Sequence, residues 1–65
     1  MKISTWIRET REAKAQGPFA AARAIGVHRV TLARWEAGSR TPQVDGLVAL
    51  ARWAGVEVGV LAVMR

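Results

Sequence analysis

The chain has 65 residues, of which 51% are hydrophobic, and it contains no cysteine. This length allows one small globular domain, taken here as residues 1–65, and the lack of cysteine excludes a disulfide framework, a thiol nucleophile and a cysteine-based zinc site. The net charge of +5 favours a polyanion such as nucleic acid as partner, although solubility alone also accounts for it.

The first predicted element is an amphipathic helix from about Thr5 to Gln16. Ile3 and Ile7 fall on one side of it, and Ser4 or Thr5 is suited to cap its N-terminus. Because charged residues follow within a few positions of the start, we expect no signal peptide. The apolar stretches are too short for a membrane span.

A second helix is expected to begin at Pro18, because proline is favoured at the first helical position. It should end at Gly26, where glycine adopts a positive φ at little cost. Its alanines favour helix and leave little bulk, so that another helix can approach closely. The third helix is predicted from His28 to Ala37, with Gly38 stopping it.

Thr41 and Pro42 predict the cap and the first turn of a fourth helix that ends before Gly55. Gly46 inside this helix costs about 1 kcal/mol relative to alanine. The apolar residues follow a helical period, and their predicted inward face comprises Val44, Leu47, Val48, Leu50 and Ala51.

The tail VEVGVLAVMR has two readings. Val58, Leu61 and Ala62 could face inward from a short helix, whereas the alternation of valines favours a strand. A lone strand would have to pair with a second chain. We predict a short helix and regard residues 56–65 as a candidate dimerisation or protein-binding segment.

Residues 18–37 therefore form two short helices joined by a glycine turn, which is a helix-turn-helix arrangement. In such a motif, one side of the later helix packs on the protein and the other lies in the major groove of DNA. Here the later helix is the third predicted helix, from His28 to Ala37. By helical period, Leu32 and Trp35 share one side with Thr31, whereas Val30 and Arg34 point away. We therefore expect Leu32 and Trp35 to be buried and Val30 and Arg34 to be exposed.

Three segments in this order and spacing resemble the Cro/repressor-type helix-turn-helix domains of phage and bacterial regulators, also called the xenobiotic-response-element type. They are IRETREAK, GPFAAARAIGVHRVTLARWEAGSRTP and LVALARWAGVEVGVL. The resemblance runs from about Ile7 to Leu61. It implies an all-α, lambda-repressor-like compact bundle of four to five short helices. Such domains are commonly dimeric, bind operator DNA and regulate transcription.

The resemblance also implies structural roles. Arg11 and Glu36 match a pair that forms a partly buried ion pair in many relatives, although two exposed charges worth under about 1 kcal/mol are the alternative. The remaining structural positions are a small residue at the helix crossing, the turn glycine and four core residues. These are Ala22, Gly26, Ile25, Val27, Leu32 and Trp35.

The family's base-reading positions match Arg29, Val30 and Arg34. Arginine can bond guanine O6 and N7 together, and valine can contact a thymine methyl. Each of the three could instead be a solvated surface residue. Phosphate contacts are expected from the start of the second helix, from the third helix and from the loop after it. The candidates are Phe19 through its amide, Arg23, His28, Thr31, Ser39, Arg40 as the leading one, and Thr41.

Two departures from the family pattern stand out. Pro18 replaces the glutamine that begins the second helix in most relatives, where it bonds phosphate and braces the recognition helix. That phosphate contact is lost, because proline has neither a side-chain amide nor an N–H. His28 replaces the usual Ser or Thr cap and could touch phosphate, especially when protonated. As the only histidine, it is not expected to bind a metal.

No enzyme is expected, because the sequence lacks paired catalytic groups and a Gly-rich phosphate loop. No cofactor, metal, membrane or small-molecule ligand is expected either. The prediction is a cytoplasmic, sequence-specific double-stranded DNA-binding regulator, a Cro-like phage, prophage or bacterial repressor that binds a palindromic operator as a homodimer. Without a sensor or effector domain, its occupancy would follow concentration and operator sequence. The alternative is an antitoxin or phage accessory protein that uses this fold to bind a protein partner.

Overall fold

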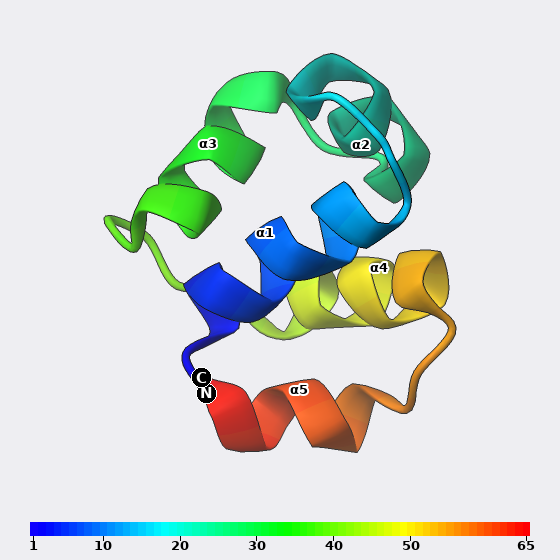
Figure 1. Ribbon diagram of the computed structural model, residues 1–65. Helices are drawn as coiled ribbons and strands as arrows, with labels where there is room; N and C mark the ends of the chain where they lie inside the picture. The colour runs from blue at the N-terminus through cyan, green and yellow to red at the C-terminus, as the bar shows by residue number, and fades with distance from the viewer.

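The computed structural model describes all residues from 1 to 65 and contains five α-helices and no strand (Figure 1). The helices are α1 (Ile3–Ala13), α2 (Pro18–Ile25), α3 (Arg29–Ala37), α4 (Val44–Ala54) and α5 (Val58–Met64). The expected all-α bundle is confirmed, and the tail is a helix, as predicted. No helix combines the length and apolar character that crossing a membrane requires.

One core holds the five helices together. α3 packs against α1 and α2, while α4 packs against α2 and α5 (Figure 1). Eleven apolar side chains make up this core, and every helix contributes at least one. They are Ile3, Ile7, Ala21, Ala22, Ile25, Leu32, Trp35, Leu47, Leu50, Ala51 and Leu61.

The predicted start of α1 is wrong. The helix begins at Ile3 with Lys2 as its N-cap, and no side chain caps it, so Ser4 and Thr5 lie inside the first turn. The reason is tertiary: starting at Ile3 places Ile3 and Ile7 four residues apart on the buried face. Burial of both side chains outweighs the absent cap.

The predicted end of α1 is also wrong. The helix stops at Ala13, and Ala15, not Gly17, takes the positive φ of +55° that ends it. The Gln16 N–H then donates to the Arg11 carbonyl at 3.1 Å. Two side chains hold this turn: Arg11, at its start, donates to the Gln16 carbonyl at 3.2 Å, and Trp53 of α4 donates from Nε1 to Gln16 Oε1 at 3.0 Å.

The start of α4 differs from the prediction as well. Gln43 is the N-cap, so Thr41 and Pro42 precede the helix instead of opening it. Pro42 is fully buried, and a Cβ added to Gly46 would lie only 3.3 Å from its Cβ. The proline therefore packs over the first turn of α4, a position it could not take as part of that turn.

Four side chains expected to face inward do not. Val44 and Val48 of α4 and Val58 and Ala62 of α5 are all exposed. Val44 is the first residue of its helix, and Val48 lies on the flank of the Leu47–Leu50–Ala51 stripe. α5 packs chiefly against one helix, so only Leu61 is fully covered. An apolar surface remains open on α4 and α5.

The turn between α2 and α3 uses the conformational freedom of glycine. Gly26 has a φ of +93°, and the N–H groups of Gly26 and Val27 both donate to the Ala22 carbonyl, at 2.8 and 3.0 Å. His28 then caps α3, since its Nδ1 accepts from the Val30 N–H at 3.1 Å. Both ends of this connection are thereby fixed by hydrogen bonds.

Candidate nucleic-acid interface

α3 presents two different faces. The buried face carries Leu32 and Trp35, which are 1% and 7% exposed, and the outward face carries Val30, which is 41% exposed, and Arg34. The orientation expected from the helical period is confirmed. The outward face therefore combines a methyl-bearing surface with a guanidinium group.

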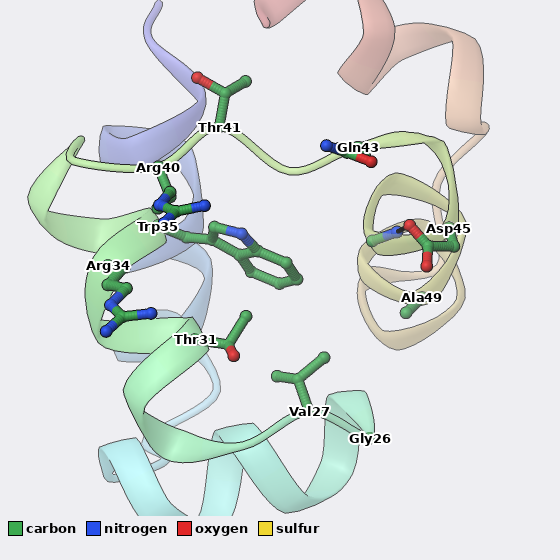
Figure 2. Close-up of a pocket in the computed structure, with 11 residues that line it drawn as sticks. Gly26, Val27, Thr31, Arg34, Trp35, Arg40, Thr41, Gln43, Asp45 and Ala49 are labelled. Carbon is green, nitrogen blue, oxygen red and sulfur yellow. Dashed lines mark hydrogen bonds between the residues drawn. The ribbon is translucent and has the colours of Figure 1, made fainter.

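Gly46 explains how α3 sits beside α4. A Cβ at this position would lie 2.9 Å from Cζ2 of Trp35, which is closer than real side chains approach. The absence of a side chain lets the indole lie directly on the α4 backbone. Figure 2 shows the ring of Trp35 lying between α3 and α4. The glycine that disfavours helix thus has a packing role.

An open groove of about 430 Å³ runs between α3, the connection after it and α4. Arg34 and Arg40 lie on its α3 side, and Asp45 lies on its α4 side (Figure 2). Thr31 is half-buried and points into the groove, while Thr41 lies on the connection above it. Two predicted phosphate-binding threonines and two arginines therefore share one groove.

The connection after α3 uses its hydrogen-bond donors internally. The Arg34 carbonyl accepts from the Ser39 N–H at 3.1 Å, from the Arg40 N–H at 3.3 Å and from Ser39 Oγ at 3.3 Å. The Gly38 N–H donates to the Trp35 carbonyl at 3.2 Å. The N–H groups of Gly38, Ser39 and Arg40 are therefore already used within the connection, and the exposed Arg40 and Thr41 side chains remain as donors there.

Glu36 is held in a network with α1. Arg11 donates from Nε to Glu36 Oε2 at 2.7 Å and from Nη2 to Oε1 at 3.1 Å, and both side chains are largely buried. Arg8 donates to the Glu36 carbonyl at 3.0 Å. The side-chain hydrogen bond to Glu36 raises the pKa of Arg11 above its usual value. Because Glu36 is the single carboxylate between Gly17 and Val44, this pairing leaves the surrounding surface positive.

The other predicted contacts lie on the exposed surface of α2 and the start of α3. Arg23 and Phe19 of α2 and His28 and Arg29 beside α3 are all exposed. The Arg29 guanidinium lies over the Phe19 ring, with Cζ 5.0 Å from the ring centroid. Since Nδ1 of His28 is used in the cap, only its Nε2 is available to a ligand.

The helices that carry these residues match a known protein family. A family model described as helix-turn-helix, of the Cro/C1 type, matches residues 20–61. The chain belongs to this family. The match extends from the first turn of α2 into α5, and it makes this Cro/C1-type domain a DNA-binding transcription regulator. No curated protein and no solved structure matches the chain.

Three features of this Cro/C1-type domain, two at its surface and one in its core, were not predicted from the sequence. The stack of Arg29 on Phe19 and the place of Asp45 in the groove depend on how separate helices meet, and no local pattern signals them. Gly46 did carry a signal, because a glycine inside an otherwise apolar helix indicates a close approach. Its partner, Trp35, could not be named before the fold was known.

Proposed function

We propose that this protein represses transcription by placing α3 in the major groove of a palindromic operator. The observation that carries the proposal is the exposed face of Val30 and Arg34 opposite the buried Leu32 and Trp35. Arg34 and Arg29 would each bond a guanine edge, and Val30 would contact a thymine methyl. These three contacts would read sequence, at about 1–3 kcal/mol of discrimination for each good bidentate pair.

The phosphate contacts would position the domain without reading sequence. Arg40 is the leading candidate for such a contact, because its side chain is exposed beside Arg34. The N–H groups of Gly38, Ser39 and Arg40 are already bonded within the protein. Arg23, His28 and the Phe19 amide would meet phosphates at the other end of α3, and Thr31, Ser39 and Thr41 would complete the contacts around the groove. Ser39 would first have to release the Arg34 carbonyl.

The proposal includes a homodimer, and the exposed valines of α4 and α5 are its interface. Five valines of these helices are exposed although they are apolar, as the core residues are. They are Val44, Val48, Val58, Val60 and Val63. A second copy would cover this apolar surface and add mass-action stability to a small domain. Two-fold related α3 helices would then read half-sites about one helical turn apart.

The proposed role is regulation by binding, without catalysis, cofactor, metal or small-molecule ligand, in the cytoplasm of a bacterial or phage-infected cell. Selection of bound duplexes from a random pool tests it. We expect a palindromic consensus with guanines in each half-site. Affinity for that consensus should fall steeply as salt rises, because arginine contacts release counterions. A pool without consensus would contradict the proposal.

A second candidate function rests on the same exposed valines. An antitoxin or phage accessory protein would use Val56, Val58, Val60 and Val63 to grip a different protein. Such an interface would depend weakly on salt, whereas operator binding would depend on it strongly. The combination of a featureless duplex pool and salt-insensitive binding to a protein would favour this candidate.

A further inference from the structure

We propose that the Phe19 side chain is a positioning residue for Arg29 in sequence readout. This inference rests on the proposed function and deepens it. Phe19 is the one phenylalanine of the chain and is 62% exposed, so its ring contributes little to the core. The ring instead lies under the Arg29 guanidinium, 5.0 Å from Cζ to the centroid. A large apolar side chain is thus kept at the surface against a cation.

Both members of the stack stand on fixed backbone. Phe19 follows Pro18, whose ring fixes φ and opens α2, so the phenylalanine occupies the second helical position. Arg29 is the first residue of α3, directly after the His28 cap that holds the Val30 N–H. The two side chains therefore meet across the two motif helices and not along one flexible segment.

The stack leaves Arg29 chemically free for DNA. Cation–π contact uses the face of the guanidinium, while bonds to guanine O6 and N7 use its N–H edge. No carboxylate pairs with Arg29, since the salt bridges of the chain join Glu36 to Arg8 and Arg11. Stacking restricts the side chain before DNA arrives, so less rotamer freedom is lost on binding.

The test measures duplex binding by the full chain on its selected operator. Phe19→Leu removes the aromatic face, and Phe19→Tyr keeps it and serves as the matched control. We expect Phe19→Leu to weaken binding about two- to fivefold, as loss of an exposed cation–π contact implies. The base preference should flatten at the pair that Arg29 reads and stay unchanged elsewhere. Phe19→Tyr should retain both affinity and preference.

A double-mutant cycle and an NMR measurement separate positioning from general stabilisation. In an Arg29→Ala background, Phe19→Leu should have no further effect on affinity. In the free protein, the Arg29 side-chain protons should show an aromatic ring-current shift that Phe19→Leu abolishes and Phe19→Tyr keeps.

Three outcomes decide the matter. An unchanged operator affinity and base preference in Phe19→Leu, with wild-type protein binding normally, would overturn the inference alone. An equal loss in the wild-type and Arg29→Ala backgrounds would also overturn it, because the ring would then act independently of Arg29. Wild-type protein without any sequence preference would overturn the proposed function and this inference with it.

Discussion

At the scale of single residues, the contact between Gly46 and Trp35 joins packing to function. Trp35 and Arg34 belong to the same helix, α3. The position of the Trp35 indole against α4 therefore sets the orientation of the outward face of α3, which carries Val30 and Arg34. A methyl group at Gly46 would meet the ring at 2.9 Å, with Pro42 at 3.3 Å on another side. Because Trp35 and Pro42 are both buried, either would have to shift within the packed core to admit the methyl group.

We therefore expect Gly46→Ala to destabilise the protein by about 1–3 kcal/mol, as overpacking of a core does. Urea denaturation measures the change. Gly59→Ala in α5 is the matched control, because nothing lies within 4 Å of a Cβ there, and it should be neutral or stabilising. Equal behaviour of the two variants would contradict the close-packing explanation.

The Arg11–Glu36 pair carries a second prediction. Arg11→Gln would leave a largely buried carboxylate without its two strongest donors, so we expect a loss of about 1–3 kcal/mol in unfolding free energy. Arg8→Ala, at a half-exposed side chain, should cost under about 1 kcal/mol. Thermal or urea unfolding of both variants checks the order, and a reversed order would contradict it.

The pH dependence of this pair follows from the raised pKa of Arg11. Its pKa in the folded protein lies above the ordinary value of an arginine, so the stabilisation is fully present below the unfolded-state pKa and is lost only as pH rises through the folded one. Unfolding free energy should therefore show no loss from Arg11 across the neutral and mildly alkaline range.

At the scale of elements, the end of α1 is the least regular feature of the fold. Ala15 adopts a φ of +55°, a conformation in which L-residues other than glycine are disfavoured by about 1–2 kcal/mol. The bonds from Arg11 and Trp53 to Gln16 hold the turn in place. The strained backbone is thus held by side-chain hydrogen bonds, one of which comes from a different helix.

Ala15→Gly should raise the unfolding free energy, by about 0.5–1 kcal/mol. Relief of the left-handed strain exceeds the extra freedom that glycine adds to the unfolded chain, which is about 0.4–1 kcal/mol. Ala24→Gly, at an exposed position within α2, is the control and should destabilise by a similar amount. A loss of stability in Ala15→Gly would show that the turn is not strained.

The sequence predicted that these segments are helices better than it predicted the residues at which each helix begins and ends. Gly26, Gly38 and Gly55 each follow a helix with positive φ, and this local chemistry is visible in the chain. The starts of α1 and α4 depend on burial of Ile3 and Pro42, which only tertiary packing decides. Helical period likewise predicted the faces of α3, whose inner side packs against α1 and α2, and failed for Val44 and Val58, where no helix covers the side chain.

At the scale of the whole molecule, the open apolar surface on α4 and α5 predicts self-association. Val63 is 87% exposed, so a charge there should leave the fold unchanged while opposing burial at an interface. We expect Val63→Glu to shift sedimentation from dimer towards monomer and to weaken operator binding. Arg52→Glu, an exposed charge change on α4, is the control. Unchanged sedimentation in Val63→Glu would place the interface elsewhere.

The central claim is that the outward face of α3 and the connection after it bind duplex DNA. Its most direct test is the affinity of the Arg29→Ala, Arg34→Ala, Arg40→Ala triple variant for the selected operator, measured by fluorescence anisotropy beside wild type. All three side chains are exposed, so circular dichroism should show an unchanged fold. We expect operator preference to disappear and the salt dependence of residual binding to fall. Operator binding by the folded triple variant at wild-type affinity would contradict it.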